Sequence, residues 1–441
     1  MTRNPAIELR QISKSFGPVQ ANKDINISVM PGTIHGIIGE NGAGKSTLMS
    51  ILYGFYKADA GEIFVDGKKI SIPDSQAAIA AGIGMVFQHF KLVENFSVLE
   101  NIVLGAESGA LLAPSLSKAR TELAELASEY ELNVDPDAII EDIGVGMQQR
   151  VEILKALYRQ ANILILDEPT GVLTPAEADQ LFRILKRLRE EGKTIILITH
   201  KLREIMDITD TVSVMRQGEM TATLKTDDTS PEDLAELMVG RKVLLRVDKT
   251  TAKPTKPVLE VQNLSMIDDF GVQRLKNINL IMDFMAWENA VFGYHREKTN
   301  QANKFFMDNN AIRKETEEKM KRFDVRPPNP KLTAKNFSGG NQQKIVLARE
   351  IERNPDLLLV GQPTRGVDIG AIEFIHQQIV ALRDQGKAIL LISVELDEIL
   401  SLSDRVLVMF DGEIMGERQP ANTNEKELGL LMAGVSEKAA Q

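Results

Sequence analysis

Gly39-Glu-Asn-Gly-Ala-Gly-Lys-Ser46 is the stretch that decides the fold of this chain, because it matches the phosphate-loop pattern G-x-x-x-x-G-K-[ST]. The apolar run IHGII (34–38) predicts a strand before it, and TLMSILYGF (47–55) predicts a helix after it. Glycines let backbone N–H groups turn toward phosphates, and the helix start presents its positive end to them. An ordinary Gly-rich turn is the alternative, and both flanks argue against it. The stretch therefore predicts a nucleotide site, with Lys45 on the β and γ phosphates and the Ser46 hydroxyl on Mg²⁺.

Two later strands end in polar residues that suit the same site. ILILDEP (163–169) predicts a buried strand ending in Asp167 and Glu168, and TIILITH (194–200) predicts another ending in His200. Asp167 stands where a contact to Mg²⁺ is needed, Glu168 could polarise an attacking water, and His200 could hold the γ-phosphate. Such residues alone are more often solvated or structural. The phosphate loop earlier in the chain favours the catalytic interpretation.

Two further candidates carry weaker signals. Gln88, in MVFQHF, follows a strand-like run and could bridge Mg²⁺ to the helical segment after it. Phe16 could stack on adenine, with core packing as a nearly equal alternative. The histidines at 35, 89, 295 and 376 show no metal-ligand spacing, so we expect them to be structural or surface residues.

Composition excludes several classes of protein. The chain has 441 residues, 43% of them hydrophobic and 26% charged, which is typical of a packed protein of two or three domains. A net charge of −10 argues against bulk attraction to nucleic acid. Zero cysteines exclude disulfides and thiolate metal sites. The N-terminus shows no signal-peptide pattern, and no apolar run approaches the roughly 20 residues that span a bilayer, so a membrane role is expected to be peripheral.

The chain also repeats itself. Several stretches recur, and their spacing changes along the chain: QQR (148–150) and LMVG (237–240) recur 194 residues later, IELRQIS (7–13) recurs about 253 later, and NFSVLENIVLG (95–105) recurs 188 later. The drop in spacing predicts that the second half lacks about 65 residues, the equivalent of 28–91. In both halves strand patterns alternate with helical patterns, which predicts an α/β fold with parallel sheets.

In this order the motifs resemble those of ATP-binding cassette (ABC) proteins, and more narrowly the tandem ATPase subunit of bacterial simple-sugar or nucleoside importers. The stretches that carry the narrower resemblance are MVFQHFKLVENFSVLENIVLG (85–105), GVGMQQRVEILKALYR (144–159), LDEPTGVLTPAE (166–177) and QPTRGVDIGAIEFIH (362–376). A weakened signature in the first half and Gln362 in the second make nucleoside importers the closer resemblance.

The resemblance implies two tandem ABC domains with the P-loop NTPase fold, each with an antiparallel β and a helical subdomain, the second lacking its P-loop strand and helix. The expected boundaries are 1–240 for the complete cassette, 241–257 for a basic, proline-containing linker, 258–435 for the truncated cassette and 436–441 for a tail. Losing the central strand should leave LLLV (357–360) with an unpaired edge. An error in the gene assembly is the alternative explanation of the gap.

In such proteins two cassettes face head to tail, and each ATP lies between one phosphate loop and the other half's signature. The resemblance places a first site, with ATP and Mg²⁺, on Phe16, Gly39, Glu40, Asn41, Gly42, Ala43, Gly44, Lys45, Ser46, Thr47, Gln88, Asp167, Glu168 and His200. Lys45, Gln88, Glu168 and His200 would be catalytic, and Ser46, Gln88 and Asp167 would hold the metal. The opposing signature is Phe337 to Asn341, with Ser338, Gly339 and Gly340 at a predicted helix start, and Asp368 would complete the site.

The second site is expected to be inactive. Its signature, Ile143 to Met147, lacks the serine, and Gly361 and Gln362 replace the two carboxylates. An amide cannot accept a proton as a carboxylate does. Val394 replaces the histidine, and the second phosphate loop falls in the missing stretch.

The function that this resemblance implies is an ATP-hydrolysing subunit of an uptake transporter for nucleosides or simple sugars. Two membrane permease subunits and an extracytoplasmic solute-binding protein would be its partners, without nucleic acid and with possible self-association. It would lie at the cytoplasmic face of the bacterial membrane. Two alternatives stay open: a non-catalytic remnant of such a subunit, and a soluble tandem cassette protein acting on ribosomes or nucleic acid.

Overall fold

The chain divides into two compact units, Met1–Val243 (unit 1) and Leu244–Gln441 (unit 2). The division falls inside the segment predicted to be a linker, 241–257. The structure is a computed structural model, and it describes residues 4–87, 90–106, 112–171, 173, 175–243, 249, 258–259, 280–294, 301–303, 306–364, 367, 369–432 and 434. In this part of the chain, no helix combines the length and the apolar composition that crossing a bilayer requires.

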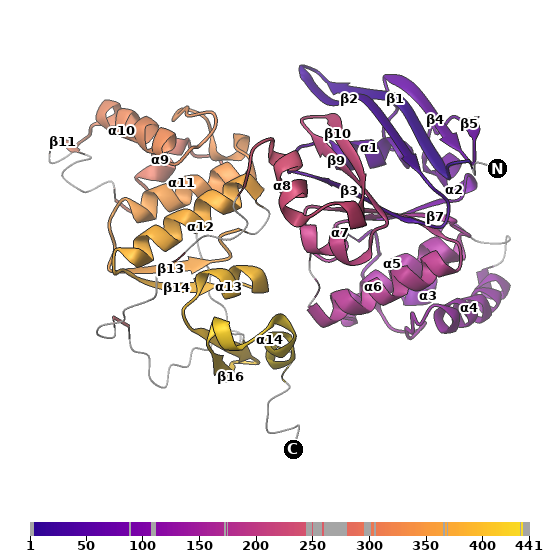
Figure 1. Ribbon diagram of the computed structural model, residues 1–441. Helices are drawn as coiled ribbons and strands as arrows, with labels where there is room; N and C mark the ends of the chain where they lie inside the picture. Colours follow the sequence, from indigo (N-terminus) through magenta and orange to yellow (C-terminus); the bar gives the residue numbers. More distant parts are fainter. Residues whose placement is uncertain are drawn as a thin grey trace. The chain divides into compact units, whose positions relative to one another are not determined.

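Unit 1 is built on a six-stranded sheet (Figure 1). Its strands, in spatial order, are β10 (Glu219–Lys225), β9 (Thr211–Arg216), β3 (Ile34–Gly39), β8 (Thr194–Thr199), β7 (Ile163–Asp167) and β6 (Ile83–Val86). The pairs from β9 to β6 are parallel, and β10 is antiparallel to β9. Every residue of β3, β7 and β8 is buried, which explains their continuous apolar runs.

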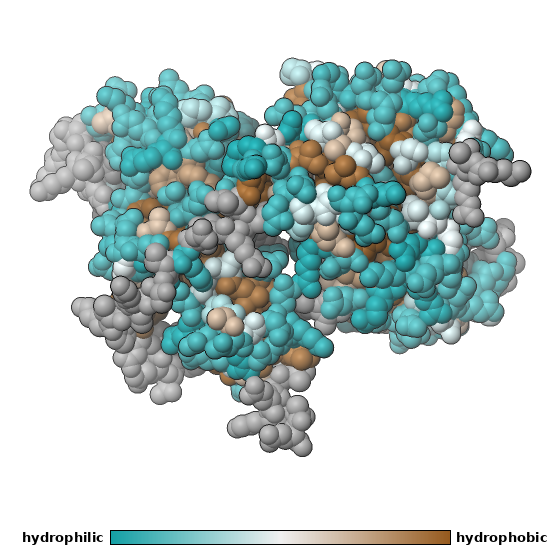
Figure 2. Space-filling view, in the orientation of Figure 1, coloured by the Kyte–Doolittle hydropathy of each residue, from teal (hydrophilic) through white to brown (hydrophobic). Residues whose placement is uncertain are grey.

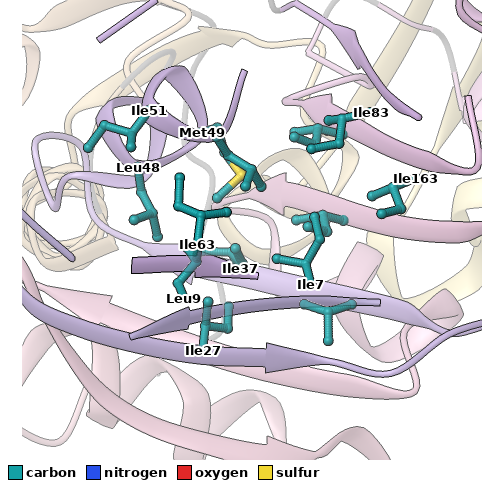
Figure 3. Packing of buried hydrophobic residues seen from close by; sticks show 14 of the residues in the cluster. Ile7, Leu9, Ile27, Ile37, Leu48, Met49, Ile51, Ile63, Ile83 and Ile163 are labelled. Atoms are coloured by element: carbon teal, nitrogen blue, oxygen red, sulfur yellow. The ribbon is translucent and has the colours of Figure 1, made fainter. Parts of the chain in front are cut away.

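A second, antiparallel sheet packs with this one through a shared core. Its strands are, in spatial order, β2 (Val19–Val29), β1 (Ile7–Phe16), β4 (Ala60–Val65) and β5 (Lys68–Ile70). Figure 3 shows Ile7 and Ile27 of this sheet, Leu48 of α1 (Lys45–Leu52) and Ile163 of the large sheet in one apolar cluster. The helix predicted over 47–55 therefore ends three residues early, at Leu52.

Helices complete unit 1. They are α2 (Ser75–Ala80), α3 (Val98–Val103), α4 (Leu112–Glu129), α5 (Val145–Tyr158), α6 (Pro175–Glu190), α7 (Leu202–Ile208) and α8 (Pro231–Val239). α3, α4 and α5 pack on one another and form the helical subdomain. A capping box fixes the start of α3, because the Ser97 N–H donates to Glu100 Oε2 (2.8 Å) and the Glu100 N–H donates to Ser97 Oγ (3.2 Å).

Unit 2 keeps the helical subdomain and part of the sheet. Its elements are α9 (Ala286–Ala290), β11 (Gln301–Asn303), β12 (Phe306–Met307), α10 (Asn309–Arg322), α11 (Gly339–Ile351), β13 (Leu357–Gly361), α12 (Ile369–Asp384), β14 (Ala388–Ile392), α13 (Leu396–Leu402), β15 (Val406–Phe410), β16 (Glu413–Arg418) and α14 (Glu425–Met432). The shift of 194 residues makes β13, β14, β15 and β16 the counterparts of β7, β8, β9 and β10.

In the part of unit 2 that the structure describes, the counterparts of the large-sheet strands form two separate pairs. β13 pairs in parallel with β14, and β15 pairs antiparallel with β16. In unit 1, β3 lies between β8 and β9 and joins the two pairs. Among the residues that the structure describes in unit 2, no strand joins β14 to β15 or pairs with the other edge of β13. The edge of β13 at 357–360 has no partner strand among these residues, but the reason expected for it is wrong: in unit 1 the matching edge of β7 is covered by β6, whereas the central strand β3 pairs with β8 and β9.

One face of the β13–β14 pair is exposed. Leu358 and Val360 pack into a core cluster with α12, whereas Leu359 is 63% exposed. Leu390 and Ile392 of β14 are exposed as well. Their counterparts in unit 1, at positions 165, 196 and 198, are buried in the cluster of Figure 3. Figure 2 shows apolar residues on the surface of unit 2 among hydrophilic ones.

Candidate nucleotide-binding site

The predicted site residues of unit 1 lie at one edge of its parallel sheet. Ile38 of β3 pairs with Thr199 of β8, and Asp167 of β7 pairs with Ile198 of β8. The carboxyl ends of the three strands therefore lie side by side. The phosphate loop, His200 and the two carboxylates each follow one of these ends, which is where open α/β sheets bind ligands.

The phosphate loop is held in a conformation that needs glycine. Gly44 has a φ of 98°, and a Cβ there would lie 2.2 Å from the carbonyl oxygen of Ala21. The Asn22 side chain donates to the Gly44 carbonyl (3.1 Å), and the Gly218 N–H donates to the Ala43 carbonyl (3.1 Å). Strand β2 and the β9–β10 turn thus support the loop from outside. α1 begins directly after it, so its first N–H groups can face a phosphate.

Lys45 is buried within this loop. Its Nζ donates to the carbonyl oxygens of Gly39 (2.7 Å) and Glu40 (3.0 Å). Burial lowers the pKa of Lys45, and the negative charges of Glu168, Asp167 and Glu40 oppose that shift. The cation is therefore held where phosphate oxygens would approach the loop.

Ser46 and Asp167 meet as the metal prediction requires. The Ser46 hydroxyl hydrogen-bonds to the Asp167 carboxylate. Burial raises the pKa of Asp167 and the neighbouring charge of Glu168 adds to this, while the bond from Ser46 and the charge of Lys45 oppose it. A hydroxyl next to a buried carboxylate fits Mg²⁺, which usually takes few protein oxygens and fills its shell with phosphates and water. Within the described ranges, no group of three or more acidic or histidine side chains is arranged so that it could hold a metal ion. Gln88, the third predicted metal ligand, lies outside them.

Glu168 and His200 are in direct contact. His200 Nδ1 lies 2.9 Å from Glu168 Oε1. Burial raises the pKa of Glu168, but the hydrogen bond from His200 and the positive charges of His200, Lys45 and Lys201 outweigh it, so the pKa lies below its usual value. Glu168 is also held in the left-handed region, with a φ of 47°, and its N–H donates to the Ile198 carbonyl (2.8 Å). The site thus holds an ionised carboxylate that can accept a proton from water.

Phe16 lies at the end of β1 and is 44% exposed. Its ring packs edge-on against Tyr56, with 5.1 Å between ring centroids. This exposure argues against the core-packing alternative. The stacking of Phe16 on adenine stays a prediction.

The signature of unit 2 forms a helix start, as predicted. Ser338 is the N-cap residue of α11, and Gly339 and Gly340 begin the helix. Asn341 Nδ2 donates to Ser338 Oγ (2.9 Å), and Asn341 Oδ1 accepts from the Arg326 N–H (2.8 Å). In unit 1 the corresponding helix, α5, has Gly144 as its N-cap, and neither N-cap residue makes a side-chain cap hydrogen bond. Asp368 lies outside the described residues.

Unit 2 keeps the backbone of the catalytic turn without its chemistry. Gln362 stands at the position of Glu168, with a φ of 50°, and its N–H donates to the Ile392 carbonyl (2.8 Å). Gly361 stands at the position of Asp167, and Val394, at the position of His200, is 57% exposed. The same turn therefore forms in both units, and only unit 1 carries ionisable groups on it.

Sequence reasoning missed two buried polar residues beside the site, Thr170 and Glu204. The Thr170 hydroxyl donates to Glu204 Oε1, and both residues are buried. A glutamate one helical turn after His200 was the available signal, but its partner could be recognised only from the fold.

Comparisons with known proteins agree with this geometry. Residues 22–171 match the family model described as ABC transporter. The chain is 42% identical to the nucleoside import ATP-binding protein NupA of Lactococcus lactis, with 98% of this chain and 99% of that protein covered. It is 41% identical to the guanosine import ATP-binding protein NupO of Bacillus subtilis (98% of each) and 40% identical to the glucose import ATP-binding protein TsgD13 of Haloferax volcanii (100% and 98%). The chain therefore belongs to the ATP-binding proteins of ABC importers, which are ATPases coupled to transport.

Proposed function

We propose that this chain hydrolyses ATP at one composite site, formed by the phosphate loop of unit 1 and the signature of unit 2, and thereby drives nucleoside uptake. The observation that carries the proposal is the contact between Glu168 and His200, close enough to Lys45 for its charge to lower the pKa of Glu168. In unit 2 the matching positions hold Gln362, with the same backbone conformation as Glu168, and Val394. The phosphate loop, Lys45, Ser46, Asp167, Glu168 and His200, which the first site needs from unit 1, lie in the described part of that unit. The groups that a second site would need are replaced.

In this scheme the chain's own groups position water and stabilise charge. The ionised Glu168 orients a water for attack on the γ-phosphate and accepts its proton. Lys45 and the start of α1 stabilise charge on the phosphates, and the signature that begins at Ser338 is the proposed second source of phosphate donors. Ser46 and Asp167 would hold Mg²⁺, and when bound the ion would supply further charge neutralisation.

Nucleosides are the proposed solute class because of the relatives. NupA and NupO, named for nucleoside and guanosine import, are 42% and 41% identical to this chain, against 34% for a ribose import protein of Clostridium tetani. A glucose import protein at 40% makes simple sugars the alternative. Mass spectrometry of the ligand that co-purifies with the partner solute-binding protein tests the choice. A sugar in that protein would contradict it.

A groove in unit 1 is the proposed docking place of a permease subunit. It has a volume of about 270 Å³ and is lined by Tyr53, Phe55, Phe87, Leu104 and the cationic Lys155 and Arg159, among others. Aromatic rings flanked by cations suit a partner segment that is apolar with an acidic or carbonyl-rich end. Phe55 is 53% exposed. We propose that the protein works as a peripheral subunit at the cytoplasmic face of the membrane, bound through this groove.

Two observations support the proposal that unit 2 lacks the equivalent of 28–91. The first is the separation of β13–β14 from β15–β16. The second is alignment length: 98% of 441 residues is about 432, so about 70 of the 503 positions aligned with NupA have no residue from this chain. The proposed domains are a complete cassette over 1–240, a linker over 241–257, a truncated cassette over 258–435 and a tail over 436–441.

The exposed apolar face of unit 2 favours a second candidate, a non-catalytic remnant of such an ATPase. Thermal unfolding with and without Mg-ATP separates the two, since a ligand stabilises the folded state that it binds. Cooperative unfolding that shifts upward with Mg-ATP supports the motor. Gradual unfolding without a shift supports the remnant.

The decisive test of the motor is ATP turnover by the full-length chain. We expect Glu168→Gln to lower kcat by about 100-fold or more, since it removes the proton acceptor. Gln362→Ala, at the matching position of unit 2, is the control and should keep the parental rate. A Glu168→Gln variant as active as the parent would refute the mechanism.

A further inference from the structure

Glu204 is a buried carboxylate that the hydrolysis scheme does not use. It lies on α7, one helical turn after His200, and is 5% exposed. Burial raises its pKa, and the hydrogen bond from Thr170 opposes that shift. A buried carboxylate is costly to the folded state unless it is well bonded. The place of this one beside the catalytic pair therefore needs a reason.

The Thr170–Glu204 hydrogen bond joins the same two segments that carry the catalytic pair. Thr170 stands two residues after Glu168 on the segment that follows β7, and Glu204 belongs to the helix that follows β8. These segments are also connected by the 2.8 Å bond from the Glu168 N–H to the Ile198 carbonyl and by the 2.9 Å contact between His200 and Glu168. Along the chain, Thr170 follows Glu168 and Glu204 follows His200, so their bond connects the two segments farther from the strand ends than these contacts do.

Unit 2 provides a comparison within the same chain. The counterparts of Thr170 and Glu204 are Thr364 and Glu398, and both are buried. Glu398 Oε1 bonds to Nε2 of His376 on α12, at 3.0 Å. In unit 1 the position of His376 is occupied by Phe182. The glutamate thus bonds to the catalytic turn in the unit that has a Glu–His pair, and to a helix in the unit that has lost it.

We propose that Thr170 and Glu204 are positioning residues for ATP hydrolysis. Their hydrogen bond holds the segments after β7 and β8 at the separation at which Glu168 and His200 touch. Neither residue contacts the nucleotide, and both act through the catalytic pair. The inference rests on the proposed function, in which Glu168 orients the attacking water.

Steady-state ATP turnover by the full-length chain tests the inference. Thr170→Val removes the hydroxyl at nearly constant volume, Glu204→Met removes the acceptor, and Thr170→Ser restores a hydroxyl. We expect the first two to lower kcat about 10- to 100-fold with KM for ATP changed less than about twofold, because a displacement near 1 Å costs that much in rate. Thr170→Ser should recover most of the rate. Thr364→Val, the same change in unit 2, is the matched control and should leave kcat within about twofold of the parent.

A second measurement does not depend on turnover. Because the Glu168 carboxylate can only accept, His200 donates from Nδ1, and its side-chain ¹⁵N chemical shifts report that tautomer. His200→Gln identifies the signals. We expect Thr170→Val to shift them toward a mixture of tautomers, while Thr364→Val leaves them in place.

Three results would overturn the inference: parental kcat in Thr170→Val, failure of Thr170→Ser to recover a lost rate, or unchanged His200 signals in Thr170→Val. A Glu168→Gln variant with the parental rate would overturn the proposed function instead. A failure of the positioning role is therefore distinguishable from a failure of the mechanism.

Discussion

Neighbouring residues on β13 should differ sharply in what they contribute to stability. Side chains alternate along a strand, so Leu359 and Val360 point to opposite faces. Val360 is 7% exposed and packs under α12, whereas Leu359 is 63% exposed. On β7 of unit 1 the matching residues, Ile165 and Leu166, are both fully buried. Truncation to alanine should therefore be costly on both faces of β7 and on only one face of β13.

The structure sets the size of each effect. Val360→Ala removes two buried carbons, which costs about 1.5 kcal/mol in transfer free energy and more for the cavity. Leu359→Ala removes three carbons that are only about one-third buried, so we expect about 1 kcal/mol or less, with no cavity because water fills the space. Ile165→Ala should cost about 2–5 kcal/mol of the stability of unit 1.

Trp287 makes the measurement specific to unit 2. It is the single tryptophan of the chain, lies in α9 and is 7% exposed, so its fluorescence reports the unfolding of that unit. With a urea slope of about 2 kcal/mol per molar, Val360→Ala should lower the midpoint by about 1 M and Leu359→Ala by less than about 0.5 M. For Ile165→Ala in unit 1, the loss of stability is measured by amide hydrogen exchange of residues 163–167. Equal midpoint shifts for the two β13 variants would mean that the face is covered and that the account of unit 2 is wrong.

Three further predictions concern the site, and a fourth concerns the buried His35 of β3. Lys45→Ala should weaken ATP binding about 100-fold by calorimetry, because it removes the buried cation of the loop, whereas the exposed Lys69→Ala should not; equal affinities would contradict the phosphate-loop assignment. Ser338→Ala should slow turnover about tenfold if the signature of unit 2 caps the phosphates, and an unchanged rate would exclude the composite site. Burial raises the pKa of Asp167 above its value in the unfolded chain, so the folded state loses stability as rising pH ionises this carboxyl group. Asp167→Asn should therefore raise the melting temperature at pH 7 without nucleotide. The same variant should lose the upward shift of the melting temperature that Mg-ATP causes in the parent. Burial lowers the pKa of His35 to about 4, so below about pH 6.5 the unfolded state takes up a proton that the folded state does not. The unfolding free energy of unit 1 should therefore fall by up to about 3 kcal/mol between about pH 6.5 and 4. If His35→Gln shows the same dependence of unfolding free energy on pH, other groups cause that dependence.

Much of the site could be predicted from the sequence because its signals are local. The phosphate loop needs glycines at set positions between a strand and a helix, and the structure has β3 and α1 on either side of it. Asp167 and His200 were recognisable because each ends a continuous apolar strand. Parallel strands buried on both faces leave their carboxyl ends as the place for polar groups. The start of α11 at Ser338 was also predictable from local sequence, since serine is favoured at the residue where a helix begins.

The order of strands in space was decided only by the tertiary structure. Along the chain β3 comes long before β8 and β9, and nothing local says that it lies between them. That placement is the reason why the pairs β13–β14 and β15–β16, which have no described strand between them, form separate sheets in unit 2. The Thr170–Glu204 bond is likewise decided only by the tertiary structure, because it joins residues 34 positions apart. Motifs determine what each strand end can do, whereas long-range packing determines which ends meet, because pairing between distant segments depends on the free energy of the whole core.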